Sequence, residues 1–498
     1  MTAGATFAAM VAPAAAQLEV ADNVAFDNAD LGAGTIQPDD NLAAAIDHGD
    51  FDADGYGDIV VGIPGDGTVG GSIRSIPGSP DGPVPAASTF VSQNTLFGDA
   101  AGEGEQGDRF GHAVAVGDFN ADGFDDVAVG VPYEDHSGNT DAGAVNIVYG
   151  SAAGLTDLGF ASITEADLRG APNDGDLFGW ALAVGDFDAD GYDDLAVGKP
   201  GEDILRRNAT DAGAVDVLYG SPTGITSQRA RILNQFGRIA GIPQDGDRYG
   251  YALAAGDFDG DGDDDLAVGI PFEDIRGRAD AGKVNIIGGS PDGIAVAGNF
   301  FVSQRGAVPG IPEPGDWFGR SLVAADLDGD GIVDLAAGVP GEGLRGEAGT
   351  GAVNVTYGST RSLAGGESQL FSQAGPVPGL LEAGDQFGWA VAAGDTDLDG
   401  VDNLVVGIPG EGLGARNEAG GAIVFGSDSS GVVIAGAEYY NQRRPVFGLP
   451  QTGDRFGEAL AVGDTNGDDG PELIVGVPFE DKGGVVDAGQ VHVIFNSR

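Results

Sequence analysis

The chain lacks cysteine altogether, carries only three lysines (Lys199, Lys283 and Lys482) and contains no long apolar run. The absence of cysteine excludes a disulfide framework, a thiolate metal site and a cysteine nucleophile. No stretch of about 18 apolar residues occurs, so the sequence predicts no membrane-spanning helix. An extracellular protein of this composition needs a source of stability other than disulfides, and bound metal is one such source.

Basic residues are few: the chain has 23 lysines and arginines and 78 acidic residues, which gives a formal net charge of −55. Such a chain repels phosphate groups, which argues against nucleic acid and against anionic membrane surfaces as partners. The acids are mostly aspartate, 60 of the 78, and glycine numbers 90. Both residues favour tight turns. The acidic surface suits a high-salt habitat and a calcium-loaded protein equally well, and composition does not separate the two.

The first residues, Met1 to Gln17, form an apolar, alanine-rich stretch that ends in an Ala-x-Ala pattern. This stretch is typical of a secretory signal with cleavage after Ala16, although a basic start is missing. A disordered tail over residues 1–16 is the alternative interpretation. We expect residues 17–498 to form one domain.

Seven acidic loops divide the chain into equal units. The loops begin 68, 68, 71, 69, 69 and 69 residues apart, and such a steady period indicates one repeated architecture rather than several domains. An aromatic-glycine pair stands eight residues before each loop, except in the first unit, where Leu42-Ala43 replaces it. The six pairs are Phe110-Gly111, Phe178-Gly179, Tyr249-Gly250, Phe318-Gly319, Phe387-Gly388 and Phe456-Gly457.

Each unit reads as four short strands joined by turns, without a helical period. Radial repetition of four-stranded units makes a propeller. The last unit ends after its third strand, Val491 to Phe495, whereas Asn23 to Asp27 is a strand-like segment that belongs to no unit. The sequence therefore predicts an all-β fold: a seven-bladed β-propeller of four-stranded antiparallel blades, with the N-terminal strand completing the last blade and closing the ring.

The loops follow the pattern Asp-x-Asp-x-Asp-Gly-x-x-Asp, which is typical of a calcium site. Calcium takes six to eight oxygen ligands, and alternate acids on a tight loop direct their oxygens to one point. Magnesium is less suited, because it needs smaller octahedral sites and keeps its waters. The alternative is a set of aspartate-glycine turns without metal. Acids at the same four offsets in all seven units favour calcium, up to seven ions, one for each blade.

We number the loop positions one to nine and expect ligands at positions one, three, five and nine, with a backbone carbonyl at position seven. Unit six has asparagine at position nine, and unit seven departs most, with Asp469 in place of glycine. The candidate ligands in chain order are Asp50, Asp52, Asp54, Tyr56 and Asp58; Asp118, Asn120, Asp122, Phe124 and Asp126; Asp186, Asp188, Asp190, Tyr192 and Asp194; Asp257, Asp259, Asp261, Asp263 and Asp265; Asp326, Asp328, Asp330, Ile332 and Asp334; Asp395, Asp397, Asp399, Val401 and Asn403; Asp464, Asn466, Asp468, Gly470 and Glu472.

The aromatic-glycine pairs, the acidic loops and a Gly-x-Pro after each second strand, such as Gly130-Val131-Pro132, together resemble the FG-GAP repeats of the integrin α propeller. The resemblance covers residues 27–498. It implies a seven-bladed propeller with calcium in the strand 1–2 loops on the lower face and with ligands docking on the upper face. Every unit here has an acidic loop, whereas integrins carry such loops in only some blades.

Two further features bear on function. An acid recurs sixteen residues after each loop start, for example Glu134 and Glu273, and we interpret it as a structural hydrogen-bonding group of the blade. Trp180, Trp317 and Trp389 stand beside aromatic-glycine pairs, where we favour packing in the core or at the rim over the alternative of lining a sugar-binding funnel.

No nucleophile elbow, phosphate-binding loop or histidine cluster occurs, so we expect a non-enzymatic protein. The favoured function is an extracellular, monomeric binding or adhesion module whose upper face engages a protein or glycan. The alternatives are the scaffold of a secreted carbohydrate-active or phospholipase-like enzyme, and a structural protein of a surface layer or matrix.

Overall fold

The structure is a computed structural model that describes residues 23–495 apart from 32–36, 68, 99–103, 158, 169, 240, 306–307, 444–445 and 447. The expected signal segment, residues 1–16, lies outside the described residues.

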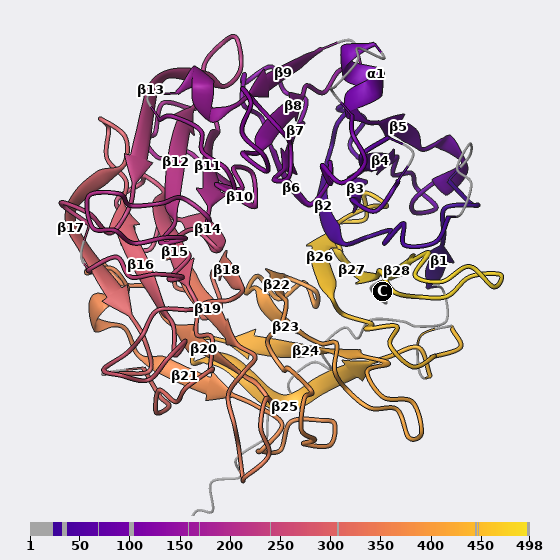
Figure 1. Cartoon of the computed structure of the whole chain (residues 1–498). Helices are drawn as coiled ribbons and strands as arrows, with labels where there is room; N and C mark the ends of the chain where they lie inside the picture. The colour runs from indigo at the N-terminus through magenta and orange to yellow at the C-terminus, as the bar shows by residue number, and fades with distance from the viewer. Residues whose placement is uncertain are drawn as a thin grey trace, which may run out of the picture.

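Seven antiparallel sheets of four strands are arranged around a central axis, as the sequence predicts (Figure 1). Each blade begins with its innermost strand and ends at the rim. Blades one to three comprise β2 (Ala45–Gly49), β3 (Asp58–Ile63), β4 (Ser72–Ile76) and β5 (Thr89–Val91); β6 (Ala113–Gly117), β7 (Asp126–Val131), β8 (Ala144–Val148) and β9 (Phe160–Ile163); β10 (Ala181–Gly185), β11 (Asp194–Lys199), β12 (Ala214–Tyr219) and β13 (Thr226–Leu233).

Blades four to six have the same order, and blade seven takes its outermost strand from the other end of the chain. Their strands are β14 (Ala252–Gly256), β15 (Asp265–Ile270), β16 (Lys283–Gly288) and β17 (Ala295–Val302); β18 (Leu322–Ala325), β19 (Asp334–Val339), β20 (Ala352–Thr356) and β21 (Ser368–Phe371); β22 (Val391–Gly394), β23 (Asn403–Ile408), β24 (Gly421–Asp428) and β25 (Gly431–Tyr440); β26 (Ala459–Gly463), β27 (Glu472–Val477), β28 (Gln490–Ile494) and β1 (Val24–Phe26).

Helical turns are short: α1 (Gln93–Phe97), η2 (Pro85–Ala87), η3 (Glu165–Asp167) and η4 (Leu363–Gly365). Within the described residues, no helix has the length and apolar character needed to cross a membrane.

The ring closes through the pairing of the first strand with the last. β1 lies antiparallel to β28, with Val24 opposite Val493 and Phe26 opposite Val491. Figure 1 shows this indigo strand beside the yellow strands of blade seven. The prediction that residues 23–27 complete the last blade is confirmed, and the closure removes an open sheet edge that would otherwise invite aggregation.

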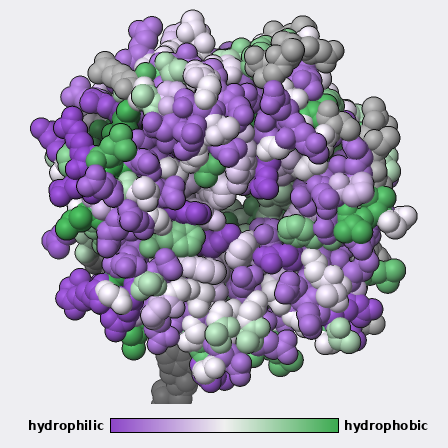
Figure 2. All heavy atoms as spheres, viewed as in Figure 1, coloured by the Kyte–Doolittle hydropathy of each residue, from purple (hydrophilic) through white to green (hydrophobic). Residues whose placement is uncertain are grey.

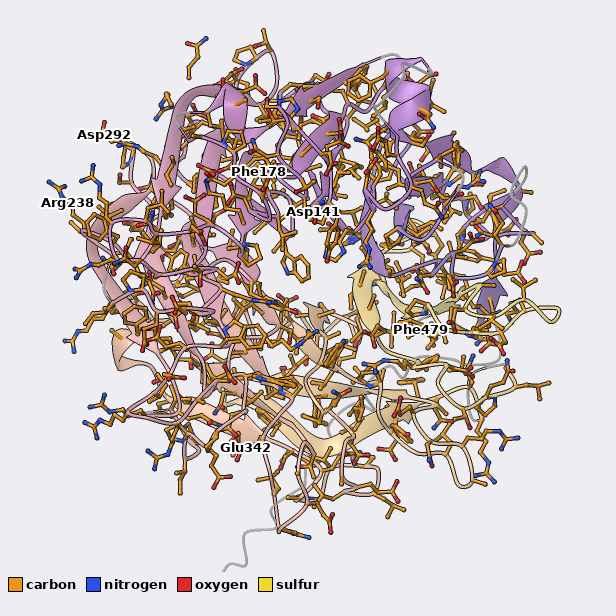
Figure 3. All side chains as sticks on the ribbon, viewed as in Figure 1. Asp141, Phe178, Arg238, Asp292, Glu342 and Phe479 are labelled. Carbon is orange, nitrogen blue, oxygen red and sulfur yellow. The ribbon has the colours of Figure 1, made fainter. Side chains whose placement is uncertain are left out.

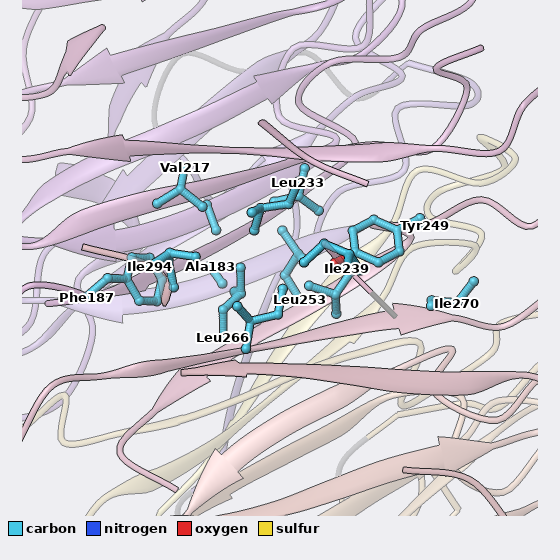
Figure 4. Close-up of a cluster of buried hydrophobic side chains, with 14 of the residues drawn as sticks. Ala183, Phe187, Val217, Leu233, Ile239, Tyr249, Leu253, Leu266, Ile270 and Ile294 are labelled. Carbon is cyan, nitrogen blue, oxygen red and sulfur yellow. The ribbon is translucent and has the colours of Figure 1, made fainter. Parts of the chain in front are cut away.

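The hydrophobic core lies between neighbouring blades rather than inside one of them. In the cluster of Figure 4, Val217 and Leu233 of blade three pack with Leu253 and Leu266 of blade four. The second strand of each blade is buried along its whole length, because it has neighbouring blades on both faces. Each blade therefore depends on its neighbours for the burial that stabilises it.

The aromatic-glycine pairs set how closely neighbouring blades approach. Phe178 forms a parallel bridge with Gly143 of the preceding blade, and its ring is fully buried. A Cβ atom on Gly130 of β7 would lie 2.0 Å from the backbone oxygen of Gly179, the glycine of that pair. The same contact recurs between Gly407 and Gly457, where the distance would be 2.1 Å. Glycine at both positions allows the two backbones to touch.

This contact predicts a strong effect of a single methyl group. We expect Gly130→Ala to destabilise the protein by about 1–3 kcal/mol, because the added Cβ meets backbone rather than a movable side chain. Gly426→Ala in β24 is the matched control, since a Cβ there meets nothing within 4 Å. Melting temperatures of both variants in calcium measure the difference, and equal melting temperatures would contradict the role of this contact.

Candidate metal centres

All seven acidic loops lie at one face of the disc, because each follows the end of an innermost strand. In blade three, for example, Asp186 follows the last residue of β10 and Asp194 begins β11. We call this side the loop face and the opposite side, where the innermost strands begin, the funnel face. The two faces correspond to the lower and upper faces expected from the sequence.

The first aspartate of each loop organises the turn. In blade three, the backbone N–H of Asp190 donates to Oδ1 of Asp186 at 3.0 Å, and that of Gly191 donates to Oδ2 at 2.9 Å. The same pair of bonds occurs in blade six, to Asp395. Gly191 has a φ of 87°, which a residue with a side chain rarely adopts. The backbone thus wraps around one carboxylate and brings the following acids to the same side.

The loop acids converge as the calcium hypothesis requires. Oxygen atoms from three acids lie within 4.8 Å of one another in four loops: Asp50, Asp52 and Asp54; Asp186, Asp188 and Asp194; Asp257, Asp259 and Asp261; Asp326, Asp328 and Asp334. In blade two, Asn120 and Asp118 share the backbone N–H of Asp122, so the asparagine occupies the expected position.

Buried oxygens without a hydrogen-bond partner mark position three. They are Oδ1 of Asp188, Asp259, Asp397 and Asn466. A buried polar atom without a partner costs about 1–3 kcal/mol. A calcium ion would supply the missing partner, so the donor set fits calcium chemically and electrostatically.

The ninth residue is the most deeply buried of the loop acids. Asp194 is fully buried and accepts two backbone hydrogen bonds, from Gly220 at 2.8 Å and from Phe187 at 3.0 Å. Burial, opposed by these bonds and reinforced by Asp188 and Asp186, raises the pKa of its carboxyl to about 8. Its counterparts Asp58, Asp126, Asp265 and Asp334 have pKa values raised to about 7, again chiefly by burial. A cation is the natural counterion for carboxyls in this position.

Blades six and seven depart at the ninth position and compensate with threonine at the second. Asn403 accepts hydrogen bonds from the N–H and the hydroxyl of Thr396, at 2.9 and 2.6 Å. Thr465 donates in the same way to Glu472. In blade seven, the amide nitrogen of Asn466 also donates to Glu472, at 2.8 Å. The loop conformation persists: Asp469, in the position of glycine, adopts a φ of 68°.

The eighth position links adjacent loops, which sequence reasoning missed. Oδ2 of Asp125 accepts from the backbone N–H of Asp50 in the preceding blade at 2.8 Å, and Asp193 accepts from Asp118 in the same way. Asp264 and Asp402 continue the series. The recurrence of an acid at this offset in four units was the available signal. Because of these bonds, the loops of blades one, two, three and five are each anchored to the next blade as well as to their own.

The recurring acid sixteen residues after each loop start forms a structural contact toward the preceding blade. Glu134, Glu273, Glu342, Glu411 and Glu480 each accept from a glutamine 38 to 41 residues earlier, at 2.6–2.9 Å. In blade three, Glu165 replaces the glutamine. Lys199 lies between Glu165, Glu202 and Asp216, at 3.3 Å from Glu202 and 3.0 Å from Asp216, and compensates the extra negative charge.

The three tryptophans lie on the funnel face. Trp180 and Trp389 line a cavity of about 410 Å³, while the ring of Trp317 lies 6.3 Å from that of Phe272. None of the three is fully buried. Trp180 and Trp389 therefore line a cavity, as the alternative of a funnel requires, and neither is fully buried in the core.

Comparison with known proteins agrees with these features. The FG-GAP repeat family matches residues 110–148, 178–218, 249–287, 318–355 and 456–494, which lie in blades two to five and seven. Integrin alpha pat-2 of Caenorhabditis briggsae is 33% identical over 248 residues, 47% of this chain and 18% of that protein. Integrin alpha-5 of Xenopus laevis is 32% identical over 249 residues, 47% of this chain and 20% of that protein.

A second group of relatives carries a different name. The phosphatidylinositol-glycan-specific phospholipase D of Rattus norvegicus is 39% identical over 163 residues, 32% of this chain and 18% of that protein. The chain thus spans at most a fifth of the length of these curated relatives.

The fold and the loops define a closed, seven-bladed β-propeller with an acidic loop in every blade. The chain carries FG-GAP repeats in five of its seven blades and is distantly homologous to both integrin alpha chains and the phosphatidylinositol-glycan-specific phospholipases D.

If calcium occupies the loops, removal of a single carboxylate should raise the melting temperature in chelator and lower it in calcium. Burial and the charges of Asp261 and Asp257 raise the pKa of Asp259. With chelator, Asp259→Ala should raise the melting temperature, because it relieves this repulsion. In calcium at about 100 times the dissociation constant, the variant should lose up to about 2.7 kcal/mol and bind one ion fewer. Asp292→Ala, an exposed rim residue labelled in Figure 3, should change neither value. The same shift with and without calcium would contradict a metal at this loop.

A buried carboxyl outside the loops predicts a pH dependence. Asp316 is buried and accepts from the N–H of Glu313, and burial followed by Glu342 and Glu313 raises its pKa to about 7. A raised pKa in the folded state stabilises the protein at low pH, and this contribution is lost as the pH rises toward 7. We compare the melting temperature of Asp316→Asn with that of the natural protein in saturating calcium. The difference in favour of the variant should be larger at pH 8 than at pH 5. Asp292→Asn should show no such difference, and parallel pH profiles for all three proteins would contradict the assignment.

Proposed function

We propose that this chain is a calcium-loaded extracellular binding module that engages a protein or glycan through its funnel face. The observation that carries the calcium part is the buried, unpartnered oxygen at position three of four loops, which in blades three and four lies among converging carboxylates. The seven acidic loops at one face hold a large share of the negative charge of the molecule. Calcium would neutralise this charge locally and stabilise the folded state by mass action.

The extracellular location is supported by chemistry and by relatives. Sites of this kind in extracellular modules have dissociation constants of about 0.1–1 mM, which suits the free calcium outside cells. The chain has no cysteine, so disulfides add nothing to its stability, and calcium would serve in their place.

Binding is favoured over catalysis because this chain matches two groups of relatives with different names. Integrin alpha chains and phosphatidylinositol-glycan-specific phospholipases D both match this chain over less than half its length. The activity named for the phospholipases therefore does not follow from the shared segment. Fold alone does not fix function, so the proposal of binding rests on the funnel face of this chain rather than on the names of its relatives.

Metal analysis and binding assays together test the proposal. We expect purified protein to carry up to seven calcium ions, and its melting temperature to fall on addition of chelator. We expect saturable binding to members of a glycan or protein array in calcium. Metal-free protein with an unchanged melt would overturn the calcium part. Release of reducing or unsaturated ends from polysaccharides would replace binding by catalysis.

A further inference from the structure

The funnel face carries a cavity on the propeller axis, to which every blade contributes the same position. The residue after each aromatic-glycine pair stands just before an innermost strand, and all seven of these residues line the cavity. They are Ala44, His112, Trp180, Tyr251, Arg320, Trp389 and Glu458. Arg109 and Phe479 add to the wall. We call this cavity the funnel; Figure 2 shows a hollow at the centre of the disc.

The funnel residues break the internal repeat. Positions that serve the blade, such as the paired glycines and the loop aspartates, recur from unit to unit. At the funnel position the seven units instead offer alanine, histidine, tryptophan, tyrosine, arginine, tryptophan and glutamate. Blade packing does not require these particular side chains, because six different residue types occupy the same backbone position. Their chemistry is therefore available for a ligand on the axis.

Aromatic rings form a continuous half-circle around the funnel. The ring of Trp180 lies 4.6 Å from that of His112 and 5.4 Å from that of Tyr251. Tyr251 lies 5.3 Å from Phe272. Trp180 and Tyr251 remain partly exposed to the cavity. Partly exposed rings beside a concave site offer flat apolar surface to a ligand, such as the C–H face of a sugar ring.

Cations without anionic partners stand beside these rings. The guanidinium of Arg320 lies 3.4 Å from the ring centroid of Trp389, and burial lowers the pKa of this arginine. Among the described residues, no carboxylate lies within ion-pair distance of Arg320 or Arg109. The charge of Glu458 in the wall opposes the effect of burial on the pKa of Arg320. Glu458 is engaged by Arg455 at 2.7 Å and by Nε1 of Trp389 at 2.9 Å. Burial and Arg109 lower the pKa of His112 to about 4, so this histidine adds no positive charge near neutral pH.

Unpaired arginines are informative in a chain with 78 acidic residues. Arg320 is partly buried, whereas Arg109 is exposed. A partly buried guanidinium without an ion-pair partner is costly, and guanidinium matches a carboxylate in a bidentate geometry. The acids that recur elsewhere are absent from the wall of the funnel except for the engaged Glu458. A carboxylate on a ligand would supply the missing ion-pair partner.

We propose that the funnel binds a sugar residue that bears a carboxylate, at the end of an acidic glycan or in a short oligosaccharide. The aromatic rings stack on the sugar, while Arg320 and Arg109 receive its carboxylate. Long polyanions are disfavoured because the net charge of the chain is −55, so a chain end is the form expected to enter. This inference rests on the proposed binding function and specifies its ligand.

Trigalacturonate and its fully methyl-esterified form are matched probes, because they share the same sugar chain and differ only at the carboxyl groups, which are charged in the acid and neutral methyl esters in the other. The chain has three tryptophans, two in the funnel wall and Trp317 beside it, so tryptophan fluorescence reports on this site. In excess calcium, we expect the acid to bind at least tenfold more tightly than the ester. Calorimetry gives the affinities independently, and a panel of other short uronates covers the choice of sugar.

Three variants locate the binding. Arg320→Gln should remove the preference for the acid, and Trp180→Ala should weaken both probes at least tenfold. Arg238→Gln at the rim, labelled in Figure 3, makes the same charge change away from the funnel and should alter neither. Melting temperature and calcium content, measured for each variant, verify that it is folded and loaded.

The outcomes separate this inference from the proposed function. If the natural protein binds the acid and the ester with equal affinity, and Trp180→Ala binds neither, the proposal of an anionic ligand is overturned and the funnel is a site for a neutral glycan. Equal affinity for triaspartate and trigalacturonate overturns the sugar. Unchanged affinity in both funnel variants, or no binding by any uronate of the panel, overturns the funnel site. In each case calcium content and a chelator-sensitive melt still support the metal part of the proposed function.

Discussion

Backbone contact between neighbouring blades is the constraint on which the whole structure depends. At the seam between blades two and three, Gly130 faces the carbonyl of Gly179 so closely that no Cβ atom fits. Since the hydrophobic core lies between blades, this contact sets the thickness of every core layer. The same seam directs the innermost strands toward the axis. Both faces of the disc inherit their geometry from it: the loops at the far ends of those strands and the funnel at their beginnings.

The two faces use the shared scaffold in opposite ways. On the loop face the chemistry is the same in every blade, with small substitutions such as Asn120 and Glu472 that keep the loop conformation. On the funnel face the equivalent residues differ from blade to blade. Innermost strands of four or five residues separate the faces by only about 13–17 Å. Stability and recognition are therefore divided between the two ends of the same short strands.

Much of this architecture follows from local, repeated patterns in the sequence. The number of blades, the ring closure by residues 23–27 and the converging loop acids all rest on signals that recur at a fixed period, and the structure bears out the ring and its closure. Contacts between loops did not emerge in this way. Asp125 and the amide of Asp50 are 75 residues apart, and only the ring brings them together. Arg320 occurs once at its position, so periodicity provides no signal for it.

The closure by β1 and β28 also determines how the ring responds to mechanical tension. Val24 lies opposite Val493, so the chain enters β1 and leaves β28 at the same end of the strand pair. A pull on both flanking segments peels these hydrogen bonds apart one at a time, rather than loading them together in shear. Blade seven is thus the place where a stretched ring opens first. If the protein is tethered through only one flanking segment, no force acts across the β1–β28 pair and the ring stays closed.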